Sequence, residues 1–144
     1  MTELSIYLDT SALLPYYRQE QLSTTVQTLL QNTARDVFIS DLTEVEVFSA
    51  LARLQRMQEL NQDQVTAITE KLEEHIQEGL FQKLALDQQS FQQAKSWLKS
   101  GQTALRTLDA LHLACVFFAR VELVTADTVL AQSAQHFGVP VQLL

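Results

Sequence analysis

Residues 4–13 are Leu4-Ser5-Ile6-Tyr7-Leu8-Asp9-Thr10-Ser11-Ala12-Leu13, and this stretch decides the fold. Its first half is a short run of β-prone residues, which predicts a strand that ends at Asp9. Thr10 and Ser11 then supply side-chain oxygens suited to capping, which predicts a helix through Tyr17. The chain therefore begins with a strand that passes directly into a helix.

The same alternation continues to the end of the chain. Further strands are predicted at 37–39, weakly at 80–86, at 121–124 and at 140–144. Apolar residues at helical spacing predict helices at 22–30, from 42 past Leu54, from 62 to Gly79, from 88 to Gly101, over 105–118 and from 127 to His136. The segment 105–118 is apolar around most of its circumference, which is typical of a helix buried between a sheet and another helix. Strands that alternate with helices predict an α/β fold of three layers, α/β/α, with a mostly parallel central sheet.

Polar residues before several of these helices match capping signatures. Asp41 with Glu44 forms a D-x-x-E pattern, in which Asp41 is expected to accept a hydrogen bond from a first-turn amide. Asn61 with Gln64 repeats the pattern before the next helix, and Asp87 is expected to cap the one that ends at Gly101. These signals set the helix starts that the pattern predicts.

Composition bounds the class of protein. A chain of 144 residues that is 47% hydrophobic fits one compact domain, which we place at residues 1–144. The sequence has no apolar run long enough to cross a bilayer and no secretion signal, which predicts a soluble cytoplasmic protein. The net charge of −7 argues against a broad basic coat for nucleic acid. The single cysteine, Cys115, lies in an apolar segment and is expected to be a small buried hydrophobe.

Two acidic residues are predicted at the carboxyl ends of strands. Asp9 follows the first strand directly, and Asp127 lies just past the strand at 121–124. Open parallel sheets form their ligand crevice at this edge. For each residue alone, capping of the next helix is the simpler explanation.

Two more acidic residues lie inside predicted helices. Asp109 has mostly apolar neighbours, and a buried carboxylate needs compensation, either from Arg106 one turn earlier or from a bound cation. Glu46 lies beyond the first turn of its helix and has no capping role, so a solvated polar stripe is its ordinary explanation. Taken singly, neither residue decides between structure and function.

Together, the four acids lie in segments that resemble the motifs of PIN-domain ribonucleases, in the order of that family. The segments are Leu8-Asp9-Thr10-Ser11-Ala12-Leu13, Ser40-Asp41-Leu42-Thr43-Glu44-Val45-Glu46-Val47-Phe48-Ser49-Ala50-Leu51, Leu105-Arg106-Thr107-Leu108-Asp109-Ala110-Leu111-His112-Leu113-Ala114 and Val124-Thr125-Ala126-Asp127. The resemblance runs from the first strand to the last and is greatest to the VapC-type toxins of bacterial toxin–antitoxin pairs.

The resemblance implies a metal-dependent ribonuclease that hydrolyses RNA phosphodiester bonds. Its catalytic and metal-binding residues would be Asp9, Glu46, Asp109 and Asp127, holding Mg²⁺ or Mn²⁺, cations that prefer oxygen ligands. The hydroxyl groups of Ser11 and Thr125 would orient these acids or water without binding the metal themselves, although helix capping explains Ser11 equally well.

The resemblance also implies partners. RNA would be the substrate, and Arg53 or Arg106 would contact its phosphates, although a solvated or ion-paired surface role is the simpler explanation for each arginine. A protein antitoxin would place its tail in the acidic pocket, and the toxin itself would be a homodimer.

Other functions have weaker support in the sequence. The three glycines form no phosphate loop or dinucleotide fingerprint, and the three histidines lack metal-ligand spacing with cysteine. His112 is expected to be a core or partly buried polar residue. The serious alternative is a PIN-fold module that binds a protein partner and is weakly active or inactive, because fold alone does not establish activity.

Overall fold

The protein is described by a computed structural model that covers residues 4–144. Its strands form one parallel five-stranded sheet in the order β3-β2-β1-β4-β5. The strands are β1 (Ile6–Leu8), β2 (Val37–Ser40), β3 (Gln82–Leu84), β4 (Glu122–Thr125) and β5 (Val141–Leu143). Every strand pairing in the described part is parallel, as the alternating pattern predicted.

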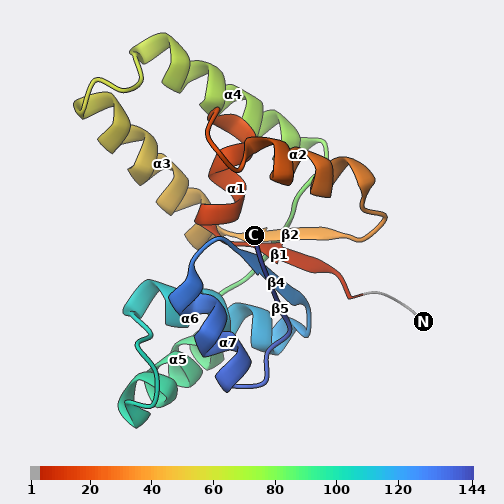
Figure 1. Ribbon diagram of the computed structural model, residues 1–144, viewed down its shortest axis with the longest axis vertical. Coiled ribbons are helices and arrows are strands. Elements are labelled where there is room, and N and C mark those ends of the chain that lie inside the picture. Colours follow the sequence, from red (N-terminus) through yellow and green to blue (C-terminus); the bar gives the residue numbers. More distant parts are fainter. Residues whose placement is uncertain (1–3) are drawn as a thin grey trace.

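Helices cover both faces of this sheet and complete the expected three layers (Figure 1). They are α1 (Thr10–Tyr17), α2 (Ser23–Asn32), α3 (Asp41–Arg56), α4 (Gln62–Gln77), α5 (Gln88–Ser100), α6 (Thr107–Ala119) and α7 (Thr128–His136). Helices α1 to α4 lie on one face, where α3 and α4 form a long hairpin, and α5 to α7 lie on the other (Figure 1). No helix within residues 4–144 is both long and apolar enough to cross a bilayer.

Each face of the sheet has its own apolar core. Successive side chains of a strand point to opposite faces, so Ile6 and Leu8 of β1 pack with α1, α3 and α4, whereas Tyr7 packs with α5, α6 and α7. In β4, Leu123 packs in the same core as Tyr7, and Val124 packs in the same core as Ile6 and Leu8. Because Tyr7 is fully buried, its hydroxyl group needs a partner inside the protein.

The predicted elements are all present, with differences of one or two residues at many ends. The first strand begins at Ile6 rather than Leu4, and the weak candidate at 80–86 is the short edge strand β3. Asn61 and Gln64 form the expected capping box of α4, and Asp87 caps α5, which ends at Gly101 in the left-handed conformation. Helix ends are the part of a pattern that sequence defines least well.

The predicted cap of α3 is wrong. Ser40, the last residue of β2, is the N-cap, and its hydroxyl group accepts a hydrogen bond from the Thr43 amide at 3.3 Å. Asp41 already belongs to the first turn, and Asp41 and Glu44 instead form ion pairs with Lys83 of β3. The strand continues one residue further than the pattern suggested, which moves the cap from Asp41 to Ser40.

The order of the strands places the ends of β1 and β4 side by side. The chain moves from β1 outward through β2 to β3, and then returns to add β4 on the other side of β1. The direction of winding therefore changes between β1 and β4, which is where open parallel sheets form a crevice beyond their carboxyl ends. Asp9 and Asp127 come from this edge.

Candidate metal and nuclease site

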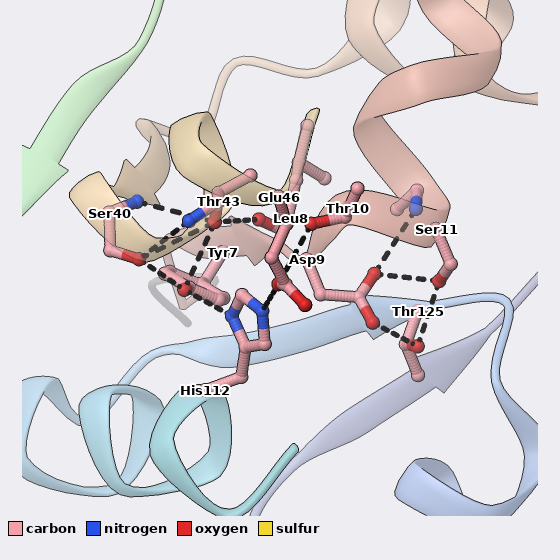
Figure 2. A network of polar contacts seen from close by, with 11 residues as sticks. Tyr7, Leu8, Asp9, Thr10, Ser11, Ser40, Thr43, Glu46, His112 and Thr125 are labelled. Carbon is pink, nitrogen blue, oxygen red and sulfur yellow. Dashed lines mark hydrogen bonds and ion pairs between the residues drawn. The ribbon is translucent and has the colours of Figure 1, made fainter. Parts of the chain in front are cut away.

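Asp9 is a buried carboxylate held by residues of α1 and by Thr125 of β4. It caps α1 by accepting a hydrogen bond from the Ala12 amide at 3.1 Å, and the residue is 4% exposed. The Ser11 hydroxyl donates to the same oxygen at 2.7 Å, and the Thr125 hydroxyl of β4 donates to the other at 2.7 Å (Figure 2). Asp9 therefore caps a helix and also stands at the crevice, so the two explanations are compatible.

Burial raises the pKa of Asp9 above its ordinary value. The hydrogen bonds from Thr125, Ser11 and Ala12, together with the charge of His112, oppose this rise without cancelling it. The ionised form of Asp9 thus stays costly despite three donors. A cation bound at the exposed side of the site would stabilise that form.

Glu46 lies in the second turn of α3 and is half-buried. Its Oε1 atom accepts hydrogen bonds from the Thr10 hydroxyl at 3.0 Å and from Nε2 of His112 (Figure 2). Burial alone would raise the pKa of Glu46, but the hydrogen bond and charge of His112, with the Thr10 hydroxyl, hold this pKa below its ordinary value. Glu46 is therefore an ionised acid with a defined orientation rather than a solvated surface residue.

His112 and Tyr7 are parts of the site that the sequence did not assign. His112 is 2% exposed, as expected of a core polar residue, and its Nδ1 atom lies 2.7 Å from the Tyr7 hydroxyl oxygen. The Tyr7 hydroxyl group also contacts Ser40 at 2.8 Å and Thr43 at 3.2 Å, and burial raises the pKa of Tyr7 far above its ordinary value. A neutral tyrosine thus joins His112 to the start of α3.

Asp109 is half-buried in the first turn of α6. Within residues 4–144 it has no side-chain hydrogen bond and no ion pair, and Arg106, the candidate partner, is an exposed residue at the N-cap of the helix. Burial raises the pKa of Asp109 most, and the negative charge of Asp127 raises it further. His112 opposes this rise, and the charges of Asp9 and Glu46 add smaller increases. The charges of the other three acids therefore act on the one that lacks a partner.

Asp127 caps α7 from just beyond β4. Its Oδ1 atom accepts hydrogen bonds from the amides of Val129 and Leu130 at 2.9 and 3.2 Å. Its own amide donates to the Thr125 hydroxyl oxygen at 3.0 Å. The contacts of Asp127 thus agree with the simpler explanation, which is that it caps a helix. Both of these capping hydrogen bonds go to Oδ1.

Ser11 and Thr125 connect these acids. Their hydroxyl oxygens lie 3.2 Å apart, both donate to Asp9, and Ser11 also accepts a hydrogen bond from the Ala126 amide at 2.9 Å. The two hydroxyl groups therefore fix Asp9 relative to the segment that carries Asp127. Ser11 does this without serving as a helix cap.

A groove leads away from the site along α3. It has a volume of about 400 Å³ and is lined by residues of three helices, namely Thr10, Glu46, Ser49, Ala50, Arg53, Arg56 and Leu108. Arg53 and Arg56 are exposed, and neither forms an ion pair with another described residue. Arg106 does not line this groove, so Arg53 has the stronger position of the two arginines proposed from the sequence.

The donor set fits a hard divalent cation. Its four acids supply carboxylate oxygens, the ligands that Mg²⁺ prefers, and Asp109 forms no ion pair with a described residue. Within residues 4–144, however, no three His, Cys, Asp or Glu side chains already form a group that could hold a metal ion. Binding would thus require side chains to move or water to bridge some of the ligands, and Mg²⁺ usually keeps several waters.

Comparison with known proteins identifies the family of this arrangement. The model of the PIN domain matches residues 6–135. No curated protein matches the sequence.

Several solved structures share the fold across nearly the whole chain. FitAcB from Neisseria gonorrhoeae is 25% identical with a TM-score of 0.73, and the match covers 94% of this chain and 95% of that one. VapC20 from Mycobacterium tuberculosis, a toxin that cleaves the sarcin-ricin loop, is 16% identical with a TM-score of 0.71 over 90% and 95% of the two chains. VapBC2 from Rickettsia felis, bound to a promoter DNA fragment, is 11% identical with a TM-score of 0.69 over 97% and 98%.

Proposed function

Since this chain belongs to the PIN-domain family, we propose that it is a metal-dependent ribonuclease and the toxin of a toxin–antitoxin pair. The observation that carries the proposal is Asp109, a half-buried acid that has no hydrogen-bond or ion-pair partner within residues 4–144, and whose pKa is raised by burial and by the charges of Asp127, Asp9 and Glu46. Like charges are gathered here at the carboxyl edge of the sheet, and a divalent cation would relieve their repulsion.

In this proposal Asp9, Glu46, Asp109 and Asp127 hold Mg²⁺ or Mn²⁺, directly or through water. A bound cation would neutralise a phosphate oxygen, lower the pKa of a bound water and stabilise the leaving oxygen. Asp9 is fixed by the hydroxyl groups of Ser11 and Thr125, and Glu46 is oriented by Thr10 and His112. Two of the four proposed ligands, Asp9 and Glu46, would thus be oriented before metal and substrate bind.

RNA would enter along α3. Arg53 and Arg56 follow Glu46 on the same groove, roughly 10–15 Å further along the helix axis at a rise of 1.5 Å per residue. They would contact phosphates of the strand whose scissile bond lies at the acids, and Arg106 would contact the strand from the exposed start of α6. In a protein with a net charge of −7, RNA binding through a few arginines at defined positions is more plausible than binding through a broad basic surface.

The same site would receive an antitoxin. The similar structures include complexes named VapBC and FitAB, three of them bound to DNA. By analogy, the tail of a protein antitoxin would place a basic side chain among the acids and block the groove. We also propose that the toxin is a cytoplasmic homodimer, which light scattering after size-exclusion chromatography would test, since a monomer at micromolar concentration would contradict it.

Cleavage of RNA with defined metal content tests the function. We expect Mg²⁺ or Mn²⁺ to support cleavage, chelation to abolish it, and Asp9→Asn or Glu46→Gln to abolish it while circular dichroism shows a retained fold. Asp87→Asn is the matched control, because Asp87 also caps a helix, with the Ser90 amide at 3.0 Å, and lies outside the site. If no RNA is cut at any metal concentration and both variants bind a partner protein normally, the chain is a binding module instead.

A further inference from the structure

We propose that His112 is a positioning residue for the nuclease reaction, that it holds the Glu46 carboxylate in place, and that Tyr7 fixes His112 in turn. This inference rests on the proposed function, since it assigns a role within the same site. It starts from a chain of side chains that runs from the start of α3 through the buried face of β1 to the acidic site (Figure 2).

The hydrogen bonds along this chain can all run in one direction, towards Glu46. The Thr43 hydroxyl donates to the Leu8 carbonyl oxygen at 3.2 Å, so its proton is used there. Ser40 can then donate to Tyr7, and Tyr7 to Nδ1 of His112, at 2.8 and 2.7 Å. Because an ionised carboxylate only accepts hydrogen bonds, Nε2 of His112 carries the proton that Glu46 accepts.

The hydrogen bonds of Ser40, Tyr7 and His112 do more than pair buried polar groups with one another. Replacing buried polar networks by apolar side chains of similar size is often neutral or stabilising, so burial alone does not require a histidine and a tyrosine here. This chain of contacts ends on an acid that is 24% exposed and lines the groove. Its last member therefore serves the surface of the site rather than the core.

Thr10 completes the orientation of Glu46. It donates to the same oxygen, Oε1, from α1, while His112 approaches from α6. With two donors from two helices fixed on Oε1, the second oxygen, Oε2, is left to face a ligand. Loss of an outer partner of a metal ligand typically weakens metal binding or activity about 10–100-fold.

A second tyrosine–histidine pair provides a matched control. The Tyr17 hydroxyl oxygen lies 2.6 Å from Nδ1 of His75, between α1 and α4, and neither residue contacts an acid of the site. Tyr7→Phe and Tyr17→Phe therefore each remove one hydroxyl group from a histidine Nδ1 atom. Only the first should disturb Glu46.

The experiment measures Mn²⁺ binding by calorimetry, RNA cleavage, and the position of Glu46 in crystals of metal-free variants. In Tyr7→Phe and His112→Leu we expect at least about a tenfold weaker Mn²⁺ affinity and a displaced or disordered Glu46 side chain. His112→Gln should recover part of the affinity, because its amide group can donate to Glu46. Tyr17→Phe should match the wild type in all three readouts.

The outcomes separate this inference from the proposed function. Folded Tyr7→Phe and His112→Leu proteins with wild-type Mn²⁺ affinity and an unmoved Glu46 would overturn it. If His112→Leu does not fold, Tyr7→Phe decides the matter. If the wild type neither binds Mn²⁺ nor cuts RNA, the proposed function fails, and a Glu46 that keeps its position in the Tyr7→Phe crystal would refute the positioning role as well.

Discussion

Asp109 differs from the other three acids in what surrounds it. Asp9, Glu46 and Asp127 each accept hydrogen bonds from the protein, whereas Asp109 has no such donor within residues 4–144. Its position in the first turn of α6 favours a negative charge, but burial and the neighbouring acids outweigh this benefit. An uncompensated acid of this kind lowers stability in return for function.

Asp109→Asn should therefore stabilise the metal-free protein at pH 7 while it abolishes RNA cleavage. The folded pKa is raised above the ordinary 3.8, so the folded state binds more protons between the two values and stability falls as pH rises through this window. The gain, up to about 1 kcal/mol, should be present at pH 7 and absent below the unfolded pKa. Urea unfolding in chelator at both pH values measures it.

Asp63→Asn provides the comparison, because Asp63 also lies in the first turn of a helix, α4, outside the site. It should leave stability unchanged or slightly lower. Equal stabilisation by both substitutions, or none by Asp109→Asn, would show that Asp109 is not opposed by its acidic neighbours.

Arg53 and Arg56 support a second prediction at this scale. Removing both with Arg53→Gln and Arg56→Gln should raise KM for RNA roughly tenfold or more, since hydrogen bonds to charged groups contribute about 1.5–3 kcal/mol, with little change in kcat. The dependence of binding on salt should also become shallower, by about 0.7 in the log–log slope for each lost contact to a single strand. Lys95→Gln together with Lys99→Gln on α5 removes the same charge from the opposite layer and should leave KM and the salt dependence unchanged. A KM equal to the wild type would exclude α3 as the path of the substrate.

Among the elements, α3 has the most connections to the site, because it carries Glu46, lines the groove and is capped by Ser40. The Ser40 hydroxyl group caps this helix and also contacts Tyr7. Ser40→Ala should therefore lower the free energy of unfolding by about 1 kcal/mol, the usual cost of a lost N-cap. Asp41→Ala should cost less, since its ion pair with Lys83 is exposed. Denaturant unfolding of both variants checks the assignment, and a larger loss from Asp41→Ala would return the cap to Asp41.

The elements also show what sequence could predict. The alternation of strands and helices is a local pattern, so it correctly placed β1, the edge strand β3 and the capping box of α4. The cap of α3 was misplaced because Ser40 and Asp41 are both good capping residues and only the end of β2 decides between them. The residue types alone therefore do not decide between Ser40 and Asp41 as the cap.

In the candidate site, too, sequence predicted the features that are local and missed those that depend on distant residues. Asp9 and Asp127 were placed at the crevice because strand ends are readable from sequence. The role of His112 was not readable, since its partners Glu46 and Tyr7 lie 66 and 105 residues away along the chain. A histidine within an apolar helix was the only local signal, and that signal is equally typical of a core residue.

At the scale of the whole molecule, the proposed cation should link the acids to the stability of the fold. A ligand that binds only the folded state adds about 2.7 kcal/mol at a hundredfold excess over its Kd. Mn²⁺ should therefore raise the Tm of the wild type by several degrees, and chelation should reverse the change. Asp9→Asn should lose this response, whereas Asp87→Asn should keep it. An equal rise in Asp9→Asn would place the stabilising ion elsewhere.

The central claim is that four acids far apart in the sequence share one divalent cation at the carboxyl edge of the sheet. Anomalous scattering from crystals grown with Mn²⁺ tests it most directly. We expect an anomalous peak among Asp9, Glu46, Asp109 and Asp127, within direct or single-water reach of each carboxylate, and no such peak in Asp9→Asn crystals. A wild-type map without a peak there, or with its peak at other residues, would contradict the claim.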